Sequence, residues 1–177
     1  MKGIVFNLLE EVVIQEFGPD VWDDLLDEAQ VGGAYTSLGN YPDTDMNALV
    51  AAAAAKLGKP PEDVLRWFGQ QAMPLLAKRY PSLFVQHTNS RSFVLSVNSI
   101  IHPEVRKLYP GADCPFFHFT DTADDGLTIG YESSRDLLAL AQGFIEGAAQ
   151  VYQEEVEIKQ LVCPHSGSFP SLRVEWT

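Results

Sequence analysis

The hydrophobic period of the chain changes near Pro110, and this change limits the folds that the chain can adopt. Before Pro110, apolar residues recur every three or four positions, which is the spacing of helices that bury one face. After it, short runs rich in β-branched and aromatic residues lie between turn signals, with one long helical run among them. Helices followed by strands are typical of an α+β fold. We therefore expect an α+β fold with a mainly antiparallel sheet.

Glycine, proline and aspartate mark the ends of the predicted helices. Gly18 ends the first apolar run and Pro19 opens the second. Asp45 is placed to cap a third helix, and Pro74 is expected to kink the fourth because proline removes a backbone donor. These signals predict helices over residues 4–17, 19–29, 46–58, 62–80 and 90–101.

The second part of the chain predicts two pairs of strands around one helix. The turn signal ADDG separates two aromatic and β-branched runs, which indicates an antiparallel pair. A helical period then returns, with Ser133 or Ser134 available as its N-cap. These patterns predict strands over 115–121, 126–133, 154–163 and 171–176, and a helix over 135–152.

Length and charge narrow the possible functions. A chain of 177 residues that is 46% hydrophobic can form one sizeable core, so we predict a single domain over 1–177. Its net charge of -12 opposes binding to nucleic acid or an anionic membrane surface. The N-terminal segment does not resemble a signal peptide, and no run approaches the roughly 18 apolar residues of a membrane span. Two cysteines fit a reducing compartment. We expect a soluble, cytoplasmic protein.

The common catalytic motifs are missing from the sequence, which contains no HExxH, Walker loop, GxSxG or CxxC. We therefore predict that the protein is not an enzyme. One of its four histidines, His102, follows a largely apolar helical stretch, so its imidazole should lie beside the core. Taken alone, such a histidine is more often a hydrogen-bonded structural residue than a ligand.

The residues that follow His102 favour a cofactor site. Tyr131, Ser133 and Arg135 alternate along the chain, and alternate residues of an extended chain face the same way. Two hydroxyls and a guanidinium fork could then converge on two carboxylates. With a histidine and an apolar wall, they are the parts of a heme pocket. The simpler alternative is that Ser133 caps a helix and Arg135 is solvated. The predicted wall consists of Leu108, Tyr109, Pro115, Phe116 and Phe117.

The sequence resembles the heme nitric oxide/oxygen binding (H-NOX) family, bacterial relatives of the heme domain of soluble guanylate cyclase. The resemblance implies that His102 is the proximal ligand of a heme b and that Pro115 presses on the porphyrin and bends it. It also implies that Tyr131, Ser133 and Arg135 hold the heme carboxylates. The heme would be buried between a distal helical lobe, approximately residues 1–60, and a proximal α/β lobe, 61–177. The similar segments are MKGIVFNLLEEVV, FGPDVWDDLL, LGKPPEDVLRWFG, His102, Pro115, Tyr131-x-Ser133-x-Arg135 and GFIEGAAQ.

The residue at position 140 bears on which gas binds. Family members that hold oxygen stably tend to have a distal tyrosine, and alignment on GFIEG puts Leu140 there. Without that donor, the resemblance implies a preference for nitric oxide, with carbon monoxide also possible. The polar residues Gln70 and Gln71 keep oxygen binding open as an alternative. The predicted distal wall consists of Leu140, Val5, Leu9, Met73 and Leu76.

The resemblance also implies a signalling mechanism. In the family, nitric oxide weakens the iron–histidine bond until it breaks, and the two lobes rotate. Pro103 cannot donate to the Ser99 carbonyl and disfavours a helical conformation at His102, so the ligand should lie at a helix end or kink and be displaced more easily. No output domain follows Thr177, so the expected partner is a separate histidine kinase, diguanylate cyclase or phosphodiesterase.

Two other interpretations stay open. Cys163 and His165 resemble part of a zinc site in some relatives, but Cys114 is the only other cysteine and a tetrahedral site normally needs four ligands. Zinc is therefore not our prediction. The chain could also be a heme-free interaction module, which would leave Arg135 and its neighbours without a purpose.

Overall fold

The computed structural model describes residues 1–161 and 169–177. The helices are α1 (Gly3–Phe17), α2 (Pro19–Ala29), α3 (Asp43–Leu57), α4 (Pro61–Arg79), α5 (Pro81–Phe84), α6 (Ser90–Leu95), the π-turn η1 (Val97–Ile101), α7 (His102–Leu108) and α8 (Leu138–Val151). The strands are β1 (Phe116–Asp121), β2 (Leu127–Glu132), β3 (Val156–Leu161) and β4 (Ser171–Trp176). The α+β prediction is confirmed. None of the helices in these two described ranges combines the length and apolar character of a membrane span.

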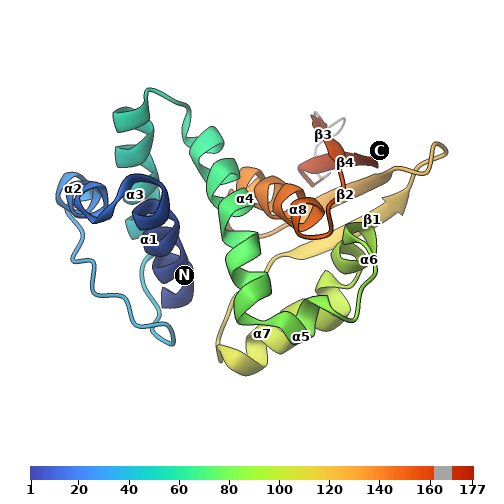
Figure 1. The fold of residues 1–177 in the computed structure, drawn as a ribbon, viewed down its shortest axis with the longest axis horizontal. Coiled ribbons are helices and arrows are strands. Elements are labelled where there is room, and N and C mark those ends of the chain that lie inside the picture. The colour runs from blue at the N-terminus through green and yellow to red at the C-terminus, as the bar shows by residue number, and fades with distance from the viewer. Residues whose placement is uncertain (162–168) are drawn as a thin grey trace.

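The first three helices and the sheet lie on opposite sides of the molecule (Figure 1). Helices α1, α2 and α3 pack together on one side, and the sheet lies on the other, with α5, α6 and α7 near it. Helices α4 and α8 pack on each other between these two parts. This arrangement produces two hydrophobic clusters, to which both α4 and α8 contribute.

The sheet is antiparallel, with the strand order β1-β2-β4-β3. One face is buried, because alternate residues of a strand point to the same side. Leu127 and Ile129 of β2 lie there opposite Val174 and Leu172 of β4, and all four pack in the same cluster as residues of α8. Strand β1 lies at one edge of the sheet, next to η1 in space.

The crossing of α4 and α8 is close because glycines lie at the contact. A Cβ atom added to Gly143 would lie 2.0 Å from the Arg66 carbonyl oxygen, which only a glycine permits. Beside this contact, Arg66 donates two hydrogen bonds to the buried Glu146 carboxylate, at 2.8 and 2.6 Å. The hydrogen bonds raise the pKa of Arg66. The charge pair therefore holds the two helices together.

Two predicted helix starts are wrong. Helix α3 begins at Asp43, so Asp45 lies within its first turn and accepts a hydrogen bond from Tyr35 Oη at 3.2 Å instead of capping the helix. Helix α8 begins at Leu138, so neither Ser133 nor Ser134 is its cap. The residues at the N-cap positions are Pro42 and Leu137, and neither makes a side-chain cap hydrogen bond.

The predicted helix over 90–101 is interrupted. It consists of α6 and the π-turn η1, and α7 follows directly at His102. Pro103 crowds the carbonyl four residues before it in an ordinary α-helix, and the wider π-turn relieves this. The junction at His102 agrees with the predicted helix end. The predicted loss of helical conformation is wrong, because His102 has φ -64° and ψ -38°.

Candidate functional site

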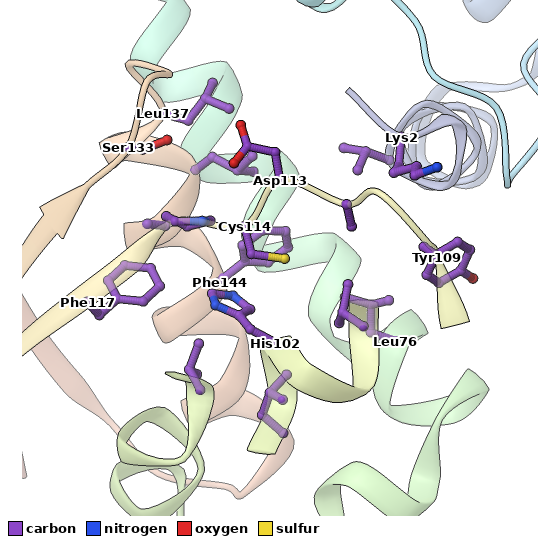
Figure 2. Close-up of a pocket in the computed structure, with 18 of the residues that line it drawn as sticks. Lys2, Leu76, His102, Tyr109, Asp113, Cys114, Phe117, Ser133, Leu137 and Phe144 are labelled. Atoms are coloured by element: carbon purple, nitrogen blue, oxygen red, sulfur yellow. The ribbon is translucent and has the colours of Figure 1, made fainter. Parts of the chain in front are cut away.

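A cavity of about 340 Å³ lies where the two hydrophobic clusters meet. Its size is within the range of small-molecule sites, roughly 300–1,000 Å³, and its lining is mostly apolar. Figure 2 shows side chains from opposite sides of this space, including His102 and Lys2. The structure brings together all of the principal predicted site residues in its lining: His102, Tyr131, Ser133, Arg135, Pro115, Leu140, Val5, Met73 and Leu76.

Two residues predicted as wall are not part of the lining. Leu9 is buried in the helical cluster and does not line the cavity, whereas its neighbour Leu8 does. Phe116 is 51% exposed because it points to the outer face of the sheet, while Phe117 points inward to the cavity. In each case an adjacent residue lines the cavity, because neighbouring residues lie on different faces of a helix or strand.

His102 projects into the cavity from the first residue of α7. Its Nδ1 atom is buried and has no hydrogen-bond partner among the described residues. Burial, helped by the nearby Arg106 charge, lowers the pKa of His102 to about 4. The ring of Phe117 lies beside it, with ring centroids 5.9 Å apart. His102 is therefore a neutral imidazole at neutral pH, which is the form that ligates a metal.

The α1, α4 and α8 side chains that line the cavity opposite this histidine are apolar. The neighbouring lining residues Lys2 and Asn40 are polar, and Lys2 Nζ donates to the Leu38 carbonyl at 3.0 Å. Leu140 and Phe144 of α8 line the cavity together with Val5, Leu8, Met73 and Leu76 from α1 and α4. The polar candidates Gln70 and Gln71 do not line it. Gln70 donates to Glu146 at 2.5 Å, and Gln71 is exposed.

The predicted donors Tyr131, Ser133 and Arg135 all reach the cavity, but they do not lie on one extended strand as expected. Strand β2 ends at Glu132, so the alternation of an extended chain does not continue to Arg135. The Arg135 backbone N–H instead donates to Ser133 Oγ at 3.1 Å, which turns the chain so that both residues still line the cavity. Tyr131 lies at the inner end, and burial raises its pKa. These side chains bring two hydroxyls and one cation to the cavity.

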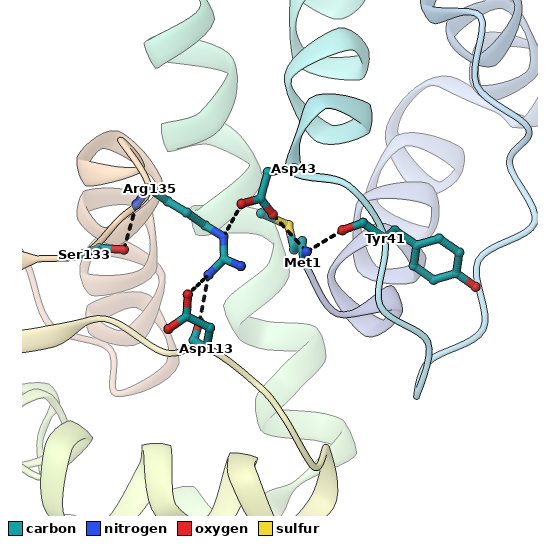
Figure 3. A network of polar contacts seen from close by, with 6 residues as sticks. All are labelled: Met1, Tyr41, Asp43, Asp113, Ser133 and Arg135. Atoms are coloured by element: carbon teal, nitrogen blue, oxygen red, sulfur yellow. Dashed lines mark hydrogen bonds and ion pairs between the residues drawn. The ribbon is translucent and has the colours of Figure 1, made fainter.

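Arg135 also joins two parts of the molecule (Figure 3). Its Nε donates to Asp43 of α3 at 2.7 Å, and its Nη1 donates to the carbonyl and a carboxylate oxygen of Asp113, both at 2.9 Å. The Met1 ammonium donates to the other oxygen of Asp43 at 2.8 Å and to the Tyr41 carbonyl at 2.6 Å. Burial alone would raise the pKa of Asp43, but the hydrogen bonds from Met1 and Arg135 lower it overall. Neither aspartate was predicted, because no local pattern signals a contact across 92 positions.

The residues present fit a heme. A neutral histidine with a buried, unpartnered ring nitrogen suits an axial ligand, and a mostly apolar cavity with a cationic edge suits a planar group that carries two carboxylates. Tyr131, Ser133 and Arg135 line the cavity and are donors of the kind that such carboxylates need, although Nε and Nη1 of Arg135 donate to Asp43 and Asp113 in this structure. The zinc alternative involves Cys163 and His165, which lie outside the described residues.

Comparison with known proteins gives consistent matches. The family model described as Haem-NO-binding matches residues 2–160. An H-NOX protein from Shewanella oneidensis, solved in the Fe(II)NO ligation state, is 31% identical with a TM-score of 0.90, and the alignment covers 100% of this chain and 99% of that one. The H-NOX domain from the same organism in the Fe(II)CO state is 31% identical, with a TM-score of 0.87 and coverage of 100% and 99%. An Fe(II) unliganded H-NOX protein from K. algicida is 25% identical, with a TM-score of 0.87 and coverage of 100% and 97%.

Proposed function

Because the chain belongs to the Haem-NO-binding (H-NOX) family of heme-based gas sensors, we propose that it binds nitric oxide in preference to oxygen and signals to a separate enzyme. The cofactor is heme b, whose ferrous iron supplies the site for a diatomic gas. The similarity to proteins solved with nitric oxide and carbon monoxide supports these two ligands.

Each side chain has a proposed role that follows from its chemistry. His102 is the axial ligand, and the low pKa of its ring keeps the ligating nitrogen unprotonated at neutral pH. Tyr131, Ser133 and Arg135 donate hydrogen bonds to the heme carboxylates, and Pro115 presses on the porphyrin. The proximal α/β lobe, 61–177, carries these groups, and the distal lobe, approximately 1–60, covers the opposite face.

The apolar distal wall is the observation that carries the proposed gas preference. Leu140, Val5, Met73 and Leu76 offer no hydrogen-bond donor to a bound gas. A ferrous-oxy complex carries partial negative charge and gains from a donor, whereas nitric oxide depends less on one. Gln70, which was considered as a possible donor to a bound gas, donates its side-chain N–H to Glu146 instead.

Signal output is proposed to follow from release of His102. Once it is released, α7 can move against the sheet, and the ion pairs between Arg135, Asp43 and Asp113 provide the route by which this movement reaches the helical lobe. The partner is a cytoplasmic histidine kinase, diguanylate cyclase or phosphodiesterase.

Visible spectra of the ferrous protein test this function. We expect a Soret band after heme supplementation, the same spectrum in air as under argon, and a distinct spectrum with nitric oxide. A stable oxy spectrum in air would contradict the gas preference. If no Soret band forms, the protein does not bind heme, and the heme-free interaction module becomes the favoured function.

A further inference from the structure

Asn98 lies in the π-turn η1, four positions before His102, and joins this turn to the edge of the sheet. Its Nδ2 donates to the Phe117 carbonyl at 2.7 Å, and its Oδ1 accepts the Phe117 backbone N–H at 3.1 Å. One side chain therefore pairs both backbone groups of one residue in β1. This is the bond pattern of a neighbouring strand.

These backbone groups have no partner within the sheet. Phe117 is opposite Tyr131 in the register, and the Tyr131 N–H donates to the Pro170 carbonyl at 2.8 Å, away from β1. The Phe117 groups therefore point outward from an edge strand, where an unpaired and partly buried N–H or C=O is costly. Asn98 hydrogen-bonds both groups, and these two bonds fix the position of the π-turn relative to β1.

Phe117 and the π-turn both contact His102, one through its ring and the other through its backbone. The Phe117 ring lies beside the His102 ring, at 5.9 Å and 32° between planes, and beside Tyr131 at 5.8 Å. From the other side, the His102 backbone N–H donates to the Val97 carbonyl within the π-turn. Asn98 therefore connects the π-turn, which holds the His102 backbone, to Phe117, whose ring lies beside the His102 ring.

We infer that Asn98 is a positioning residue that sets the orientation of the His102 imidazole. It does so by holding the π-turn and Phe117 in one register. The inference rests on the proposed function of His102 as the axial ligand. Asn98 does not itself line the cavity and reaches it through Phe117, which does.

The matched control is Asn89, which lies in the same segment. Asn89 caps α6, because its Oδ1 accepts the Ser92 N–H at 2.8 Å, and this bond stays within its own segment. N89A and N98A each remove an asparagine that bonds the backbone shortly before His102. Only N98A separates the π-turn from Phe117.

The test measures hydrogen exchange and the iron–histidine stretching frequency in wild type, N98A and N89A, with circular dichroism as the control for folding. In the heme-free proteins we expect the Phe117 amide of N98A to exchange about tenfold faster than in wild type, the equivalent of roughly one lost hydrogen bond. N89A should leave that amide unchanged. In the ferrous heme-bound proteins, the iron–histidine band should shift or broaden in N98A and stay at the wild-type frequency in N89A.

The outcomes separate this inference from the proposed function. An unchanged band in N98A, or the same shift in both variants, would overturn the positioning role, and heme loss from folded N98A alone would support it. If wild type itself takes up no heme, the proposed function fails. The exchange comparison then still decides whether Asn98 orders the turn, and equal exchange of Phe117 in N98A and wild type would overturn that.

Discussion

The substitution Gly143→Ala tests whether the close crossing of α4 and α8 is essential to the fold. The added Cβ would lie 2.0 Å from the Arg66 carbonyl oxygen, 2.8 Å from its carbonyl carbon and 3.0 Å from its Cα. All three atoms are backbone, so no side-chain rotation can make room. Real Cβ atoms essentially never come within 3.0 Å of such a neighbour, so the two helices must separate by about 1 Å.

Three effects contribute to the expected change in the free energy of unfolding. Alanine in place of a mid-helix glycine stabilises by about 1 kcal/mol, because the unfolded chain loses backbone freedom. Overpacking costs about 1–3 kcal/mol and sometimes more. Separation of the helices would also stretch the bonds between Arg66 and Glu146. We therefore expect a net loss of about 2 kcal/mol in the free energy of unfolding.

Urea denaturation followed by circular dichroism measures this loss. Gly32 provides the control, because it is exposed, a Cβ there meets no atom within 4 Å, and its φ does not require glycine. Gly32→Ala should change the midpoint little, whereas Gly143→Ala should lower it at an unchanged m-value. A Gly143→Ala protein as stable as wild type, or more stable, would refute the argument, because helix propensity would then outweigh the contact.

Further predictions concern the cavity and the ion pairs. Leu140→Tyr, which adds a donor to the distal wall, should produce a stable oxy spectrum in air at a cost of about 1–3 kcal/mol from overpacking; an unchanged spectrum would count against the importance of that wall. Pro103→Ala should restore a donor beside His102 and slow the formation of the five-coordinate nitrosyl species in stopped-flow spectra, and an unchanged rate would argue against a role for the proline. Asp43→Asn should cost about 1 kcal/mol in urea denaturation at pH 7, because its contacts with Arg135 and the amino terminus are partly exposed. The folded-state pKa of Asp43 is lowered, so this stabilisation is present above its ordinary value of 3.8 and is lost below it; a difference between variant and wild type that persists well below that pH would contradict the assignment.

Local chemistry in the sequence predicted most elements but misplaced several of their ends. Gly18 and Pro19 separate α1 from α2 as expected, because a glycine at φ 91° and a proline at the first helical position act within one or two residues. The starts of α3 and α8 were wrong because the prediction assumed a side-chain cap, whereas the N-cap residues are Pro42 and Leu137 and make no such bond. Asp45 had two possible roles that the sequence could not distinguish, a helix cap or an acceptor for Tyr35. The π-turn before His102 was missed because its pattern of apolar residues is that of an ordinary helix.

The sequence alone was enough to predict the α+β order, the family and most of the named cavity residues, including His102, Tyr131 and Leu140, although Leu9 and Phe116 were wrong. Hydrophobic period and residue type carry this information, because burial and side-chain chemistry are properties of single positions. The pairing of Arg135 with Asp43 and Asp113 became visible only in the three-dimensional structure, as did the place of Asn98 beside Phe117. Such contacts join residues between 19 and 92 positions apart. Their distances depend on how helices and sheet pack, and no local pattern encodes that packing.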